Sequence, residues 1–215
     1  NLKFCEVKNP KKINLQKSFL LSIKKRLIIC ASSTHPGEES QIAKTHLALK
    51  NKYKNLLTII IPRHIDRVKE IYKDISELNL KVTIRTSGKK IDTDTDIYLV
   101  DTYGETEKFF NISKIAFIGG SIINHGGQNP IEPARFGLSI LHGPNVQNFT
   151  EIYQFFNKSK VAHKFNNLKE LISKSDKLLM QKKNKKLNLI KIGKLILKKN
   201  LNEINKVFNN ELKKT

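Results

Sequence analysis

The sequence predicts an α/β domain in which a parallel β-sheet is covered by helices on both faces. Short apolar runs, such as residues 56–61 and 115–118, recur along the chain without alternation between polar and apolar positions. Strands of this kind are buried on both faces, as is typical of parallel sheets. Segments of helical periodicity separate the runs, and this alternation is the pattern of an α/β fold.

Each element is predicted from its own residues. Residues 26–31 and 56–61 are apolar strands, and Pro62 ends the second because proline cannot donate to the ladder. The helix at residues 130–136 is expected to start at Asn129 and Pro130, which suit a cap and a first helical position. The same criteria predict strands at residues 81–85, 97–100, 115–118, 139–141 and 161–165, and helices at residues 39–53, 66–78, 105–110, 149–157 and 168–180.

Five loops carry most of the glycine and proline of the domain and half of its histidines, and each follows a predicted strand. They are residues 32–38, 62–64, 101–105, 119–129 and 143–148. The carboxyl ends of parallel strands share one edge of the sheet, and ligands of open α/β sheets bind there. The sequence therefore predicts one ligand crevice lined by these loops.

The two ends of the chain differ from the middle. Residues 1–21 read as a connector from an upstream segment, residues 22–180 as the α/β domain that carries the crevice, and residues 181–215 as a basic helical segment with an apolar stripe. That segment either packs against its own or a neighbouring domain, or touches an anionic lipid surface. No internal repeat is found.

The net charge of +21 and the pI near 9.9 leave several partners open. Nucleic acid is one, but no zinc-finger or RNP-type motif occurs, and the tyrosines do not alternate with basic clusters. Anionic small molecules and anionic lipids account for the same charge. Two cysteines form no disulfide framework, which fits a reducing cytoplasm. No apolar run is long enough to span a bilayer, and no signal peptide is recognised.

The strongest functional signal is the segment from residue 115 to 137. A buried strand leads into Gly119, Gly120 and Ser121, where the backbone can approach a ligand closely, and a second glycine pair precedes Asn129. Free backbone N–H groups and a positive helix terminus there suit a phosphorylated ligand. Glu132, in the first helical turn, can accept hydrogen bonds from ribose hydroxyls. The segment predicts half of a nucleotide-sugar site.

The other loops are read against plainer alternatives. Residues 32–39 are either a helix start capped by serine or threonine, or hydroxyls and a histidine that hold an acidic sugar. Arg63 either binds a phosphate or carboxylate, or pairs with Asp66 or Glu70. Gly104 lets the backbone pass close to a base, although a glycine before Glu105 is equally a helix start.

Several kinds of site find no support. The acidic run at residues 92–96 offers the Asp-x-Asp pattern of a metal ligand set, but it precedes a strand, so it is interpreted as a solvated loop at the opposite edge. The six histidines lack zinc spacing, and no P-loop or serine-hydrolase motif occurs. No metal and no cofactor are expected.

Six motifs together resemble one family. They are residues 31–39, 62–64, 101–105, 117–121 and 126–132, and residues 143–149 with their Gly-Pro and Asn-Phe pairs. In order and spacing they are similar to the C-terminal half of the Kdo transferases, which move 3-deoxy-D-manno-octulosonic acid (Kdo) from CMP-Kdo to a lipid A precursor. The resemblance covers roughly residues 1 to 165. It implies a GT-B glycosyltransferase of lipopolysaccharide biosynthesis, in which this chain is the second of two Rossmann-like domains.

The resemblance also implies roles for individual residues. The residues implied for CMP are Pro62, Arg63, Tyr103, Gly104, Glu105, Asn129, Pro130, Ile131 and Glu132. The residues implied for the phosphate and Kdo are Ser33, Thr34, His35, Gly37, Glu38, Gly119, Gly120 and Ser121. Lys3 matches a family lysine that stabilises charge on the leaving phosphate. Tyr103 departs from the apolar residue found in many relatives.

In the family, a glutamate of the N-terminal domain is the general base, so the resemblance implies that this chain binds CMP-Kdo without transferring the sugar. It places the full-length protein, anchored, at the cytoplasmic face of the bacterial inner membrane, with the lipid A precursor bound mainly by the other domain and the present chain soluble. Two rivals stay open: a GT-B transferase or epimerase that uses a UDP-sugar, and a basic module that binds nucleic acid or lipid.

Overall fold

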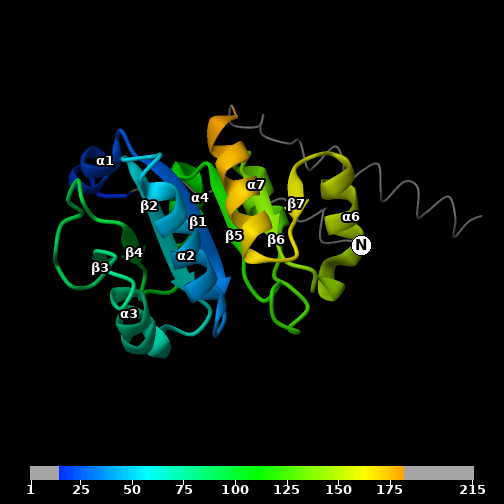
Figure 1. Ribbon diagram of the computed structural model, residues 1–215, viewed down its shortest axis with the longest axis horizontal. Helices are drawn as coiled ribbons and strands as arrows, with labels where there is room; N and C mark the ends of the chain where they lie inside the picture. The colour runs from blue at the N-terminus through cyan, green and yellow to red at the C-terminus, as the bar shows by residue number, and fades with distance from the viewer. Residues whose placement is uncertain (1–14, 182–215) are drawn as a thin grey trace, which may run out of the picture. The chain divides into compact units, whose positions relative to one another are not determined.

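The computed structural model describes residues 15–181, and within this range seven strands form one all-parallel sheet (Figure 1). The strand order is β3-β4-β2-β1-β5-β6-β7. The strands are β1 (Leu27–Thr34), β2 (Leu56–Pro62), β3 (Val82–Ile84), β4 (Ile97–Leu99), β5 (Ile115–Ile118), β6 (Ser139–His142) and β7 (Ala162–Lys164). The predicted parallel α/β sheet is confirmed.

Helices cover both faces of the sheet. They are α1 (Lys17–Ile23), α2 (Glu38–Lys50), η2 (Ile65–Arg67), α3 (Val68–Ser76), α4 (Thr106–Ile112), α5 (Ile131–Arg135), η3 (Gln147–Phe149), α6 (Thr150–Lys158) and α7 (Leu168–Met180). Helix α2 packs against α3 and α7 on one face, and Figure 1 shows α2 and α7 in front of the strands with α4 behind them.

The central strand β1 is buried on both sides, which explains its continuous apolar run. Ile29 and Ala31 belong to the core cluster beneath α2, α3 and α7. Cys30, between them, is fully buried and its thiol contacts Ser113 at the end of α4. Successive residues of a strand point to opposite faces, so in a strand covered on both faces the whole run of residues 27–31 is apolar.

The chain changes direction across the sheet between β1 and β5. From β1 it proceeds through β2, β3 and β4 on one side, and β5 then begins the other side. At such a topological switch point the loops leave neighbouring strands in opposite directions and open a crevice. The loops that follow β1 and β5, residues 35–37 and 119–130, therefore flank the expected ligand position.

Close approach between these two strands requires glycine at residue 119. Strand β1 is irregular at Ser33, whose φ is +53°, and the N–H of Gly119 donates to the carbonyl of Ser32 (2.9 Å). A Cβ on residue 119 would lie 2.0 Å from the carbonyl oxygen of Ser33. The backbones touch, and no side chain fits between them.

The observed elements agree with the predicted ones to within a few residues, with two refinements. The helix expected at residues 130–136 is shorter, because α5 spans only Ile131–Arg135. Residues 17–21, predicted as connector, belong to α1, where the ring of Phe19 lies 5.3 Å from that of Tyr98. Lys3 and the basic segment after residue 181 lie outside the described residues. None of the described helices is long and apolar enough to cross a membrane.

Candidate functional site

A buried carboxylate joins the loops that follow β1 and β5. Glu38, at the start of α2, is 0% exposed. Its Oε2 accepts the backbone N–H groups of His35 (3.0 Å) and Gly120 (2.8 Å), and its Oε1 accepts those of Ser121 (3.0 Å) and Ile122 (2.9 Å). One side chain therefore sets the distance between the two loops at the switch point.

This arrangement changes two sequence-based expectations. Free N–H groups are predicted after β5, which is wrong for Gly120 and Ser121, because both donate to Glu38. The capping alternative for residues 32–39 is also wrong, since the N-cap of α2 is Gly37 and no side chain caps it. Burial raises the pKa of Glu38, while its four backbone donors act to lower it. Glu38 shapes the loops, and its contact with a ligand stays a prediction.

Two arginines follow β2: Arg63 is exposed to solvent, whereas Arg67 forms ion pairs. The backbone N–H of Arg63 donates to the carbonyl of Thr34 (2.9 Å), which ties this loop to the one after β1. The pairing of Arg63 with Asp66 or Glu70 does not occur. Arg67 takes that place, with Nη1 3.0 Å from Glu39 and Nη2 3.3 Å from Glu70. Within residues 15–181 the exposed guanidinium of Arg63 has no ion pair, so it is available to an anion.

Three histidines meet at this edge. The ring of His35 lies 4.3 Å from that of His125 and 6.1 Å from that of His64, measured between ring centroids. His35 is buried, whereas His64 and His125 are exposed. Burial, together with the neighbouring basic groups of His125, His64, Arg63 and Arg67, lowers the pKa of His35 to about 4. In the described part of the chain, no group of three or more His, Cys, Asp or Glu residues is arranged to hold a metal ion.

The loop after β4 combines an exposed backbone with a strongly held carboxylate. Gly104 has φ +76° and open space around it, and Tyr103 beside it is 68% exposed. Glu105 accepts two hydrogen bonds from Arg85 (3.0 and 3.1 Å) and others from Thr102 and Lys108. The hydrogen bonds from Arg85 lower the pKa of Glu105 to about 2. Because the carboxylate is occupied, its direct contact with a nucleotide stays a prediction.

The segment that leads into α5 is folded over a neighbouring loop. Gly126 has φ +92°, and a Cβ on it would lie 2.4 Å from the side chain of Asn148. The Oδ1 of Asn129 accepts the N–H of Ile131 (3.0 Å), but the N-cap of α5 is Pro130 and no side chain caps the helix, so the predicted Asn129 cap and Pro130 first position are wrong. Pro130 and Ile131 are buried, while Glu132 is half-buried in the first turn of α5. Of the three, only Glu132 has side-chain surface that a ligand can reach.

The loop after β6 has a structural role. The hydroxyl of Ser121 accepts the N–H of Gly143 (2.9 Å), and the carbonyl of Ser121 accepts the N–H of Asn145 (2.9 Å). A Cβ on Gly143 would lie 2.3 Å from that carbonyl oxygen. Through these hydrogen bonds the segment around Gly143 supports the loop after β5 from the side.

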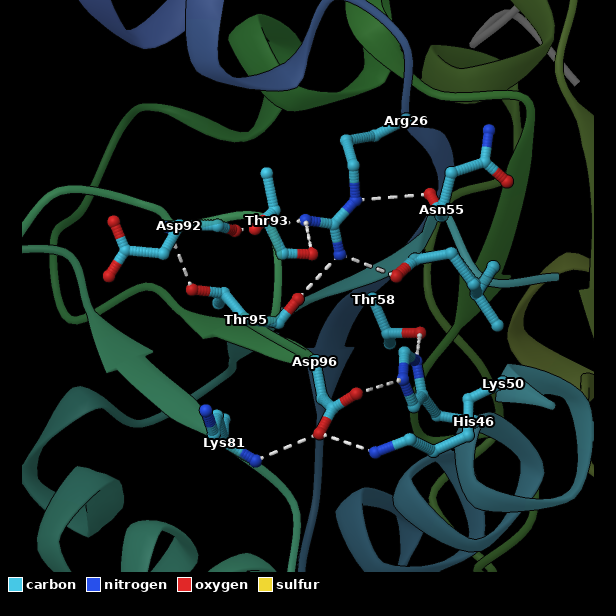
Figure 2. A network of polar contacts seen from close by, with 11 residues as sticks. Arg26, His46, Lys50, Asn55, Thr58, Lys81, Asp92, Thr93, Thr95 and Asp96 are labelled. Carbon is cyan, nitrogen blue, oxygen red and sulfur yellow. Dashed lines mark hydrogen bonds and ion pairs between the residues drawn. The ribbon is translucent and has the colours of Figure 1, made fainter.

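The acidic run at the opposite edge is only partly the solvated loop that the sequence predicts. Asp92, Thr93 and Asp94 are exposed, but Asp96 is buried and central to a network (Figure 2). The carboxylate of Asp96 accepts hydrogen bonds from His46 (3.2 Å), Lys50 (2.8 Å) and the backbone N–H of Lys81 (2.9 Å). Burial acts to raise the pKa of Asp96, but these donors outweigh it and hold the pKa below its usual range.

Arg26 completes this network by binding the backbone alone. Its guanidinium donates to five carbonyl oxygens, those of Asn55, Leu56, Asp92, Thr93 and Thr95 (Figure 2). The starts of β1 and β2 and the turn before β4 are thereby held together. The polar groups of Arg26, His46 and Asp96 are thus hydrogen-bonded within the protein. We interpret this edge of the sheet as stabilising the fold.

The loops after β1, β2, β5 and β6 are therefore linked by hydrogen bonds into one surface. The loop after β4 is held separately, by Arg85 and by the N–H of Thr86, which donates to Asp101 (3.1 Å). Sequence reasoning missed Arg85 and assigned no function to His125. Arg85 is an ordinary strand residue in the sequence, and only its partner Glu105 drew attention, whereas the place of His125 between two glycine pairs could have marked it.

Comparison with known proteins identifies the relatives of this chain. No family model matches it. The 3-deoxy-D-manno-octulosonic acid transferase of Haemophilus influenzae is 32% identical over 175 residues, which are 81% of this chain and 41% of the relative. The same enzyme of Rickettsia felis is 34% identical over 181 residues, 83% of this chain and 38% of the relative.

A solved structure shows which domain of the Kdo transferases this chain matches. The C-terminal CMP-Kdo binding domain of WaaA from Acinetobacter baumannii is 28% identical with a TM-score of 0.69, covering 73% of this chain and 82% of that one. The chain is homologous to the C-terminal domain of the Kdo transferases. The family resemblance and the GT-B C-terminal fold that the sequence predicts are thus confirmed. The chain spans about two fifths of the length of these curated Kdo transferases.

A more distant structure shares only the fold. A putative UDP-N-acetylglucosamine 2-epimerase from Listeria monocytogenes is 14% identical with a TM-score of 0.54, covering 84% of this chain and 43% of that one. At this identity the likeness concerns the arrangement of strands and helices. It carries no information about the ligand of the present chain.

Proposed function

We propose that this chain is the donor-binding domain of a Kdo transferase and binds CMP-Kdo at the carboxyl edge of its sheet. The observation that carries the proposal is the homology to a CMP-Kdo binding domain over most of that domain's length. The linked loops at the β1/β5 switch point support it, because nucleotide ligands of open α/β sheets bind at that position.

Three parts of the edge suit three parts of the nucleotide. The exposed guanidinium of Arg63, beside the loop after β1, suits the phosphate. The open backbone at Gly104 and the exposed ring of Tyr103 suit the base. The half-buried Glu132 suits the ribose hydroxyls, while Pro62, Asn129, Pro130 and Ile131 hold the backbone around it.

The chemistry follows from the donor. An acceptor hydroxyl attacks the anomeric carbon of Kdo from the face opposite CMP, the bond to the phosphate breaks, and CMP leaves with both electrons. Negative charge grows on the phosphate, where Arg63 stabilises it, with Lys3 as a further candidate outside the described residues. A carboxylate takes the proton of the acceptor hydroxyl, and the product is inverted.

We further propose that the chain by itself binds the donor without transferring the sugar. Its Kdo-transferase relatives are about twice as long, and the general base and most of the lipid A precursor site are expected in the other part. The whole enzyme would then act at the cytoplasmic face of the inner membrane. Transfer of Kdo to a lipid A precursor by the purified chain alone would contradict this proposal.

The first test is a titration of the isotope-labelled chain with CMP, UMP and AMP, followed by backbone amide resonances. We expect CMP to shift Arg63, Gly104, Gly120 and Glu132 at lower concentration than the other two nucleotides. A preference for UMP would favour a UDP-sugar enzyme instead, and salt-sensitive binding of duplex DNA without nucleotide preference would favour the basic module.

Substitution of Arg63 tests the phosphate contact. Because Arg63 forms no ion pair in the described chain, Arg63→Gln should leave the free energy of unfolding unchanged. It should weaken CMP binding by about tenfold, the effect of losing one charge-assisted hydrogen bond. Lys73→Gln, an exposed cation on α3, is the matched control and should change neither quantity. Equal losses in both variants would mean that only overall charge matters.

A further inference from the structure

A buried histidine at the switch point lies beneath two exposed ones. His35 is 6% exposed, and its ring lies 4.3 Å from that of His125 and 6.1 Å from that of His64. His64 and His125 are exposed and come from the loops after β2 and β5. A molecule that approaches His35 from solvent therefore meets these two rings first.

One buried side-chain atom of His35 and one of Thr34 lack a hydrogen-bond partner. Among the described residues, four buried side-chain atoms have no partner, and two of them are neighbours: Oγ1 of Thr34 and Nε2 of His35. An unpaired buried polar atom costs on the order of 1–3 kcal/mol, so two adjacent ones need an explanation. A ligand that supplies the missing partner is the simplest one.

The charges around His35 specify the ligand. The groups that act on its ring are His125 from the loop after β5, His64 and Arg63 from the end of β2, and Arg67 from η2, and all four are basic. The carboxylates nearby are committed, since Glu39 pairs with Arg67 and Glu38 accepts four backbone N–H groups. The cluster has hydrogen-bond donors and positive charge and lacks an anion.

The backbone of the loop after β5 lies close to the rings of His35 and His125. Gly120 has φ +66°, and a Cβ on it would lie 3.0 Å from the Cδ2 of His125 and 3.5 Å from the Cδ2 of His35. Because the N–H of Gly120 is also held by Glu38, the backbone forms a fixed wall beside the two rings. The exposed His125 is then the part of the cluster that can turn to admit a ligand to His35.

We propose that His35, His64, His125 and Arg63 form a proton-coupled anion subsite, in which His35 takes up one proton from solvent when a phosphate or carboxylate group binds. The proposal rests on the proposed function, since CMP-Kdo carries both groups. It adds that His35 is neutral without ligand, becomes an imidazolium beside the anion, and loses the proton again when the anion leaves.

The energetic argument is one of linkage. A proton on His35 is unfavourable when the ring is buried among four basic groups, and an anion beside it removes that penalty. Whatever free energy the anion gains from the protonated ring appears as a rise in the pKa of His35. We expect a rise of at least about two units, to about 6 or above, equivalent to about hundredfold tighter binding of the anion to the protonated form.

The test follows the ring resonances of the histidines of the whole chain against pH, in native protein, with four probes. Cytidine has no anionic group, CMP adds the phosphate, free Kdo has the carboxylate alone, and sulfate is a tetrahedral anion that carries no proton in this range. We expect the pKa of His35 to stay unchanged with cytidine and to rise with CMP. Sulfate raises it if the subsite takes the phosphate, and Kdo raises it if the subsite takes the carboxylate.

His163 is the matched control within the same sample. Its Nε2 is also buried without a partner, and burial and the nearby Lys174 and Lys177 lower its pKa, but it lies on β7 away from the switch point. An equal rise at His163 would show that the anions merely screen charge, and would overturn the proposal. His35→Gln should also remove the difference in CMP affinity between pH 6 and pH 8 that exceeds the titration of CMP itself.

The outcomes separate this proposal from the proposed function. If CMP binds and the pKa of His35 does not change with any probe, the anion subsite is wrong and the donor-binding domain stands. If sulfate or Kdo raises the pKa of His35 while CMP and cytidine fail to bind, the subsite stands and the nucleotide assignment fails. Absence of any effect of all four probes overturns the subsite.

Discussion

The two edges of the sheet each hold a buried histidine, and the two residues have opposite surroundings. At the amino edge, His46 is fully buried, with Nδ1 2.9 Å from Thr58 and Nε2 3.2 Å from Asp96. At the carboxyl edge, Nε2 of His35 has no partner and its charged neighbours are basic. A satisfied polar network stabilises a fold, whereas an unsatisfied one marks a place where a ligand completes the structure.

Asp96 gives the largest expected effect, because its removal leaves His46 and Lys50 without their anion. Asp96→Ala should lower the free energy of unfolding by about 3–5 kcal/mol, as for a broken buried ion pair. The pKa of Asp96 is lowered in the folded protein, so its contribution is present above the unfolded pKa and is lost as pH falls below about 4. Urea unfolding at pH 7 and at low pH measures both.

The control for Asp96 is its neighbour Asp94, which pairs with Lys81 at the surface. Asp94→Ala should leave stability unchanged, since solvent screens an exposed pair. The folded fraction of Asp96→Ala should bind CMP normally, because the amino edge takes no part in the site. If folded Asp96→Ala protein failed to bind CMP, the amino edge would also contribute to ligand binding, and the proposed difference between the two edges would be wrong.

Glu38 offers a second test of the difference between the two edges, because it stabilises the loops at the carboxyl edge, where the ligand is proposed to bind. Glu38→Gln places an amide NH₂ against backbone donors and should cost about 3 kcal/mol of stability. It should also shift the amide resonances of Gly120 and Ser121 and weaken CMP binding, unlike a change at the amino edge. Glu77→Gln, on an exposed residue after α3, should do neither. Unchanged CMP binding in the Glu38 variant would show that the loops keep their positions without it.

Two glycines at the carboxyl edge should differ in cost. Gly119→Ala forces a Cβ against the backbone of Ser33 and should destabilise by about 2–3 kcal/mol, as for overpacking. At Gly104 there is space but φ is +76°, so Gly104→Ala should cost only about 1 kcal/mol. Thermal unfolding ranks the two. A larger loss at Gly104 would mean that its loop is packed more tightly than its open surroundings indicate.

The last expected effect is a change in pH dependence, and it is absent at neutral pH. The pKa of His35 is lowered to about 4, so the unfolded chain binds the proton first and stability falls as pH drops from about 6.5 to about 4. His35→Gln should make this fall shallower, and sulfate should do the same in the native protein. Chloride at equal ionic strength is the control. A slope unaffected by His35→Gln would show that the ring titrates alike in the folded and unfolded chain.

Most of the fold could be predicted from the sequence, because each strand is a short apolar run covered on both faces and each helix lies between two such runs. Residues 115–118 and 168–180 were predicted with the boundaries that β5 and α7 have. The misjudged places are ones where a partner distant in sequence decides. Asp96 reads as loop until Lys50 and His46 of α2 are brought to it.

The sequence by itself determined the parallel α/β fold, the edge at which the site lies, and through its motifs the Kdo-transferase family. Only the tertiary structure decided which polar groups are free. Whether Glu38 faces a ligand or four backbone N–H groups, and whether Arg63 or Arg67 takes the nearby carboxylates, depends on residues that are distant in the chain. The partners of a hydrogen bond or a charge can be far apart in the sequence, whereas hydrophobic periodicity is a local pattern. The fold can therefore be predicted from the sequence more completely than the site.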